Sequence, residues 1–183
     1  MSPDRRNSIL VVIDVQERLM PVIHDADGVV RNLERLIRGC HLLGVPALLT
    51  EQYVKGLGPT VARVRSTFEE THGYRPIEKL TFSAMGVSAF AAQLAALERR
   101  HVLIAGVETH VCVYQTVRDL LAAGMQVTLV ADALSSRSAE NRELALRRMM
   151  SDGAKLGSTE LALFELLATS GTDEFRAIAT LVK

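Results

Sequence analysis

Several features that would mark a particular class of protein are scarce or missing in this sequence. Its 183 residues include 2 cysteines, no tryptophan and only 4% aromatic residues. Two cysteines cannot build the disulfide framework that stabilises many small secreted domains. We therefore expect the protein to work in a reducing compartment.

The chain also lacks an excess of charge and a long apolar segment. Lys plus Arg and Asp plus Glu both number 21, so the formal net charge is zero. A balanced surface gives no electrostatic argument for binding nucleic acid or an anionic membrane. The apolar run at 9–13 is too short for the core of a signal peptide or for a membrane span. We predict a cytoplasmic protein that binds neither nucleic acid nor membrane.

Motifs for metals and nucleotides are missing as well. The histidines show no metal-ligand spacing such as H-x-x-x-H. They stand at His24, His41, His72, His101 and His110. No G-x-G-x-x-G motif follows an expected strand, which argues against a dinucleotide-binding domain. We expect neither a bound metal nor another cofactor.

What the sequence does contain is a regular alternation of strand and helix patterns. Hydrophobic residues make up 48% and charged residues 23%, as in ordinary globular domains. Short apolar runs and helical periodicity predict the elements. Strands are expected at 9–13, 47–50, 75–81, 102–105, 126–130 and 155–157, and helices at 28–43, 60–70, 87–97, 109–123, 139–153, 159–169 and 173–181.

The alternation continues to the C-terminus without a linker-like stretch or an internal repeat. A chain of this length can bury a substantial core as one unit. We predict a single α/β domain over residues 1–183, a three-layer α/β/α fold with a doubly wound, six-stranded parallel sheet.

Cys112 lies where the strand at 102–105 gives way to a helical pattern. In the first turn of that helix, unpaired N–H groups and the positive end of the helix dipole favour a thiolate, which is a nucleophile. The alternative is that Cys112 is a buried, inert side chain, as free cysteines usually are. Cys40, which has leucines around it at helical spacing, is interpreted in that second way.

Two charged residues stand near the ends of other expected strands. Asp14 follows the run at 9–13, and Lys79 lies near the end of 75–81. Ligands bind at the carboxyl ends of parallel strands, which makes both residues candidates for the site. Asp14 could equally be a turn residue, and Lys79 a solvated edge lysine. With Cys112 they match the base, the cation and the thiol that a nucleophilic mechanism needs.

Three more residues are candidates for contacts with a substrate. Gln52 and Tyr53 open the loop after the second strand, and loops at this edge usually carry specificity. His110 precedes Cys112 by two residues and could line a pocket, although a surface position at the helix start fits it as well.

Three segments together resemble the signature regions of the isochorismatase-like, or cysteine hydrolase, superfamily. They read ILVVIDVQERL, EKLTFSAM and IAGVETHVCVYQTVRDLLAAGMQVTLVADALSSRS, and they occur in the family's order. The resemblance runs from about residue 8 to beyond 160. The segment LTEQYVKGLGPTV is similar to the isochorismatase domain-containing subgroup.

The resemblance implies an open six-stranded parallel sheet and a catalytic Asp, Lys and Cys at Asp14, Lys79 and Cys112. It also implies a cis peptide bond between Val107 and Glu108. That bond would turn the N–H of Glu108 toward the same point as the N–H of Cys112, and the two would form an oxyanion hole. Relatives form dimers and larger oligomers, so a homo-oligomer is expected.

Departures from better-defined relatives narrow the chemistry. Nicotinamidases carry an Asp-x-His metal motif after the second strand, whereas the sequence here is TEQYVKG, without a histidine. Isochorismatases proper cleave a vinyl ether and lack the cysteine at this place. We therefore predict a cysteine-dependent hydrolase that acts on a small-molecule amide or related carbonyl compound through a thioester. A catalytically silent assembly module and a thiol redox sensor at Cys112 remain as alternatives.

Overall fold

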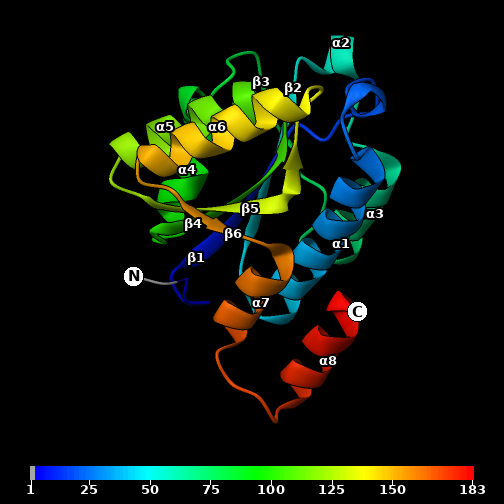
Figure 1. The fold of residues 1–183 in the computed structure, drawn as a ribbon, viewed down its shortest axis with the longest axis vertical. Helices are drawn as coiled ribbons and strands as arrows, with labels where there is room; N and C mark the ends of the chain where they lie inside the picture. Colours follow the sequence, from blue (N-terminus) through cyan, green and yellow to red (C-terminus); the bar gives the residue numbers. More distant parts are fainter. Residues whose placement is uncertain (1–2) are drawn as a thin grey trace.

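Figure 1 shows the computed structural model of the chain, which describes residues 3–183. The strands are β1 (Ser8–Ile13), β2 (Ala47–Gln52), β3 (Ile77–Lys79), β4 (His101–Val107), β5 (Gln126–Ser135) and β6 (Lys155–Gly157). The helices are α1 (Ala26–Leu42), α2 (Val54–Leu57), α3 (Ala62–Glu70), α4 (Ser88–Ala96), α5 (Tyr114–Ala122), α6 (Ala139–Ser151), α7 (Thr159–Leu167) and α8 (Asp173–Val182). Short 3₁₀ turns at Met20–Val22 and Ala84–Gly86 and a π-helical turn at Thr109–Val113 complete the elements.

The strands form one parallel sheet in the order β3-β2-β1-β4-β5-β6. The chain winds outward from β1 through β2 to β3 and then returns to β4 on the other side of β1. The strand order therefore reverses between β1 and β4. In open parallel sheets ligands bind at such a switch point, outside the carboxyl ends of the strands. The predicted doubly wound six-stranded parallel sheet is confirmed.

The two central strands explain why the sequence has continuous apolar runs. Every residue of β1 and β4 is buried, because helices cover both faces of the sheet. Successive side chains alternate between the faces. Leu10 and Val12 enter one core with α1, α3, α7 and α8, while Ile9 and Val11 enter the other with α4, α5 and α6. Figure 1 shows these two helix layers on either side of the sheet.

Some element boundaries differ from those expected from the sequence. β3 is confined to Ile77–Lys79, because the chain then turns so that the carbonyl of Phe82 accepts a hydrogen bond from Lys79. The helix α2 occupies a segment whose glycines had predicted a loop. β5 continues to Ser135 after an irregularity in its pairing with β4 between Ile104 and Gly106. No helix within residues 3–183 is long and apolar enough to cross a membrane.

Candidate active site

Asp14, Lys79 and Cys112 lie together at the carboxyl edge of the sheet, beside the switch point. Asp14 directly follows β1 and has a left-handed backbone conformation, with φ of 52°. Lys79 is the last residue of β3. Its Nζ lies 2.6 Å from Asp14 Oδ2, and neither side chain is exposed to solvent. Lys79 is therefore not the solvated edge lysine that its position in the sequence also allowed.

The buried ion pair is completed by neutral partners. Thr50 Oγ1 donates to Asp14 Oδ1 at 2.7 Å. Lys79 Nζ donates to Gln52 Oε1 at 2.7 Å and to the carbonyl of Phe82 at 3.0 Å. Charged groups removed from water need such partners, because an unpaired buried charge costs several kcal/mol. The network fixes both charged side chains in one geometry.

Cys112 lies in the π-helical turn Thr109–Val113, and its residue is 7% exposed. Burial of the sulfur, together with the neighbouring Asp14 carboxylate, raises the pKa of the Cys112 thiol to about 12, although Lys79 acts in the opposite direction. The expectation that the helix dipole favours a resting thiolate was wrong. Desolvation is the largest cause of the raised pKa. A nucleophilic role would therefore require a base at the moment of attack.

Cys40 provides the comparison within the same chain. It is fully buried in α1, and burial alone raises the pKa of its thiol to about 12. Cys112 differs because a carboxylate and an ammonium group both act on it. Burial is thus the main cause of the raised pKa of both thiols, and charged neighbours act in addition on Cys112.

The turn that carries Cys112 is held by its own backbone and by α5. The carbonyl of Glu108 accepts hydrogen bonds from the N–H groups of Val111 at 3.0 Å and Val113 at 3.2 Å. Thr116 Oγ1 donates to the carbonyl of Cys112 at 2.7 Å. The peptide bond between Val107 and Glu108 is cis, at the position that the family resemblance implies.

The three candidate substrate contacts are distributed around this centre in different ways. Gln52 uses its Oε1 for Lys79 and donates through Nε2 to the carbonyl of Leu80 at 2.9 Å, so its amide holds the lysine. Tyr53 is 54% exposed and lines a cavity of about 320 Å³ together with Lys79 and Leu80. His110 is half-buried, and its Nδ1 lies 3.0 Å from Ser136 Oγ.

Sequence reasoning missed residues that support the centre. Thr50 holds Asp14, and the available signal was that Thr50 ends the expected strand at 47–50. Gln16 donates through Nε2 to the carbonyls of Gln52 at 2.9 Å and Gly58 at 2.6 Å, which ties down the loop after β2. No sequence pattern marks Gln16, because its partners are backbone atoms.

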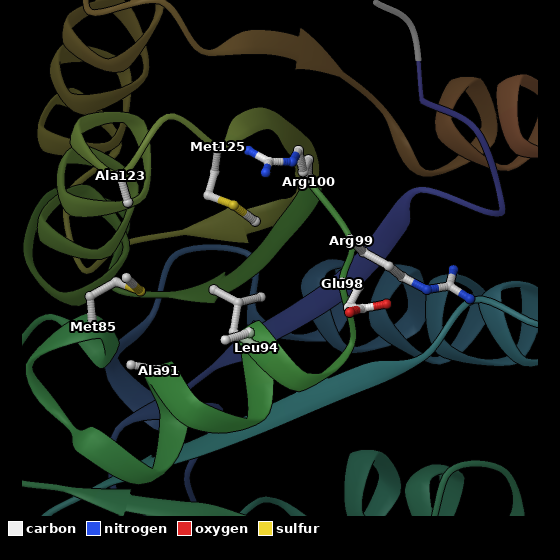
Figure 2. A pocket seen from close by; sticks show the side chains of 9 residues that line it. Met85, Ala91, Leu94, Glu98, Arg99, Arg100, Ala123 and Met125 are labelled. Atoms are coloured by element: carbon white, nitrogen blue, oxygen red, sulfur yellow. The ribbon is translucent and has the colours of Figure 1, made fainter.

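Neither a metal cluster nor the cavity of Figure 2 belongs to this site. Within residues 3–183, no group of three or more His, Cys, Asp or Glu side chains could hold a metal ion. Figure 2 shows Met85, Leu94 and Met125 facing a common space. These residues line a cavity of about 450 Å³. This cavity lies between α4 and the end of α5, and its lining does not include Asp14, Lys79 or Cys112.

The sequence matches the family model of the isochorismatase domain over residues 8–160. The chain belongs to the isochorismatase family. Isochorismatase domain-containing protein 2 of Danio rerio is 37% identical to this isochorismatase-family chain over 177 residues, which are 97% of this chain and 87% of that protein.

Solved structures agree with this assignment. The MAR1 ribonuclease of Caenorhabditis elegans superposes with a TM-score of 0.92 at 34% identity, covering 100% of this chain and 92% of that one. The YcaC gene product of Escherichia coli, described as an octameric hydrolase of unknown specificity, has a TM-score of 0.91 at 25% identity, covering 99% and 89%. The predicted family and its domain-containing subgroup are confirmed, and membership in the isochorismatase family supports a hydrolase role.

Proposed function

We propose that this isochorismatase-family protein is a cysteine-dependent hydrolase that cleaves a small amide or related carbonyl compound through a thioester intermediate. The observation that carries the proposal is the solvent-free Asp14–Lys79 ion pair beside the Cys112 thiol. A buried ion pair is weak evidence for stability, because apolar residues of similar volume often serve as well. Charged groups that perturb a thiol at a switch point are instead typical of a functional site.

In the acylation half of the reaction, Asp14 accepts the proton of Cys112 as Sγ attacks the substrate carbonyl carbon. The developing oxyanion would be stabilised by the N–H groups of Glu108 and Cys112. When the tetrahedral intermediate collapses, the C–N bond breaks and the protonated Asp14 returns its proton to the leaving amine. The product of this half is a thioester on Cys112.

In the deacylation half, the Asp14 carboxylate accepts a proton from a water molecule that attacks the thioester carbonyl carbon. The C–S bond then breaks, the acid leaves, and the proton passes from Asp14 to Cys112. Lys79 supports both halves, because its positive charge favours the ionised forms of the carboxylate and the sulfur. The raised pKa of the thiol agrees with proton transfer that accompanies attack rather than precedes it.

The decisive experiment is a small-amide library screened for ammonia release with the wild type, Cys112→Ala and the matched variant Cys40→Ala. We expect Cys112→Ala to lower turnover of any substrate by at least about 10³-fold, because the nucleophile is lost. Cys40→Ala should keep its activity, because Cys40 belongs to α1 and to the core on the other face of the sheet from Cys112. Mass spectrometry after an acid quench should find the acyl group on Cys112. Turnover that survives in Cys112→Ala would contradict the mechanism.

The panel should include a short RNA, because the Caenorhabditis elegans neighbour is named a ribonuclease. The zero formal net charge of this chain argues against strong binding to phosphates. A thiol redox sensor is disfavoured by the raised pKa of Cys112, since the thiolate is the form that oxidants attack. A silent assembly module would give no turnover with any compound of the panel.

Domain organisation, assembly and localisation are also part of the proposal. We propose that residues 1–183 act as one domain, in a homo-oligomer, in the cytoplasm. The octameric neighbour from Escherichia coli supports the assembly. Two free, buried cysteines are compatible with a reducing compartment.

A further inference from the structure

Three consecutive residues ahead of Cys112 are each bound through a side chain to one of the three residues at 135–137, where β5 ends. Thr109 Oγ1 donates to the carbonyl of Ser135 at 2.9 Å. His110 Nδ1 lies 3.0 Å from Ser136 Oγ. Glu108 Oε2 accepts hydrogen bonds from Arg137, from the backbone N–H and from Nε, both at 3.0 Å. We call residues 135–137 the β5 clasp.

The β5 clasp is itself attached to the rest of the fold. Ser135 pairs with Val107 in the sheet, so the clasp begins in regular structure. Ser135 Oγ donates to the carbonyl of His24 at 2.6 Å, and the N–H of His24 donates to the carbonyl of Ser136 at 3.0 Å. The β5 clasp, which binds the turn around Cys112, is therefore fixed both by the sheet and by His24.

Glu108 is the residue through which the clasp acts on the chemistry. Its carbonyl accepts the N–H groups of Val111 and Val113 and so shapes the turn around Cys112. Its own N–H is one of the two proposed oxyanion donors. Its carboxylate side chain is 9% exposed, whereas the Arg137 side chain that binds it is 60% exposed. A nearly buried carboxylate is thus neutralised by a cation that reaches it from the surface.

We propose that the β5 clasp positions the cysteine turn for catalysis, and that Arg137 is a positioning residue that acts through the Glu108 carboxylate. The proposal rests on the proposed function for its kinetic consequences. A displacement of about 1 Å at a reacting group can lower the rate by about 10²-fold, because donors and nucleophile must converge on one carbonyl. The contact between Arg137 and Glu108 restricts this displacement.

The first test compares Arg137→Gln with Arg137→Lys and a matched control, Arg148→Gln. Arg148 is similarly exposed, at 66%, and pairs with Asp152 at 3.4 Å on α6. We expect Arg137→Gln to lower kcat by about tenfold with KM nearly unchanged, because the turn is displaced while the candidate substrate contacts at Gln52 and Tyr53 remain. Arg137→Lys should recover part of kcat, since it keeps the cation but not the planar fork. Arg148→Gln should match the wild type.

A double variant asks whether the two groups act as one unit. Glu108→Gln combined with Arg137→Gln should lower kcat no further than the more impaired single variant, because both changes remove one interaction. A different result would be a higher KM in Arg137→Gln with the kcat of the wild type in both Arg137→Gln and Arg137→Lys. That result would assign Arg137 to substrate binding and overturn the positioning role.

The second test does not depend on activity. Hydrogen exchange at the amides of Val111 and Val113 reports on their bonds to the Glu108 carbonyl. We expect faster exchange over residues 108–113 in Arg137→Gln and wild-type exchange in Arg148→Gln. Unchanged exchange in Arg137→Gln would overturn the clasp. If the wild type turns over no compound, or Cys112→Ala remains active, the proposed function fails, and exchange alone then decides the clasp.

Discussion

At the scale of single residues, Asp14 and Lys79 connect stability with chemistry. Both side chains are fully buried, 2.6 Å apart. Removing two charges from water costs several kcal/mol for each, and their attraction compensates for this only when further hydrogen bonds satisfy the remaining atoms. Thr50 and Gln52 supply such bonds at 2.7 Å. The ion pair is therefore stable while both charges are present, and removal of either charge leaves the other buried without a partner.

Replacing Lys79 by methionine divides the pair and leaves the Asp14 carboxylate buried alone. We expect the free energy of unfolding, measured by urea denaturation, to fall by about 3–5 kcal/mol. Asp14→Asn combined with Lys79→Met should recover much of this loss, because no charge is then left uncompensated. In the control, Arg118→Met removes a 53% exposed partner of Asp119 and should cost less than about 1 kcal/mol. A loss in Lys79→Met as small as in this control would contradict the prediction.

The same residues show how far the sequence could predict the site. Asp14 and Cys112 could be predicted because each follows an apolar run typical of a buried strand, and Lys79 because it lies near the end of the expected strand at 75–81. The protonation state of the Cys112 thiol could not be predicted from the sequence. Its pKa depends on burial and on a carboxylate from another strand, neither of which a local helix-dipole argument contains.

At the scale of elements, apolar runs and helical periodicity predicted every strand and most helices. Their ends were predicted less well, because tertiary hydrogen bonds decide them. β3 ends where Lys79 binds the Phe82 carbonyl, and β5 extends where Ser135 pairs with Val107. The π-helical turn at Thr109–Val113 was also missed, since its bonds to Glu108 depend on that residue's backbone geometry.

Gly106 determines how closely β4 approaches β1 beside Asp14. Its φ is +109°, and a Cβ atom there would lie 2.1 Å from the carbonyl oxygen of Ile13. Gly106→Ala must therefore separate the two central strands, and we expect a loss of at least about 3 kcal/mol in the free energy of unfolding. Gly124→Ala is the control, since it also has a positive φ, +76°, but open space around it. Its cost should stay near about 1 kcal/mol. Equal losses for Gly106→Ala and Gly124→Ala in urea denaturation would contradict this prediction, because they would mean that the chain relieves the clash with Ile13.

At the scale of the whole molecule, the topology brings together side chains that are far apart in the sequence. The winding from β1 to β3 and back to β4 places the last residue of β3 and the residues after β1 and β4 at one edge. The two cores that flank the sheet fix this arrangement. One of them also encloses Cys40, and the other includes Cys112, so folding removes both thiols from water.

Because both thiols are buried, the stability of the molecule decreases as the pH rises in the alkaline range. The pKa values of Cys40 and Cys112 rise from 9.0 to about 12 on folding, so the native state keeps two protons that the unfolded chain releases near pH 9. The unfolded state binds fewer protons between about pH 9 and 12, and stability is lost as pH rises through this window, by up to ~1.4 kcal/mol per pH unit for each thiol.

The variant Cys40→Ala removes one of the two buried thiols and so tests this pH dependence. Its urea midpoint, although lower at pH 7 because of the cavity, should fall less steeply than that of the wild type between about pH 8.5 and 10.5. Burial also raises the pKa of Tyr74, but both proteins share that group, so parallel slopes would refute the role assigned to Cys40.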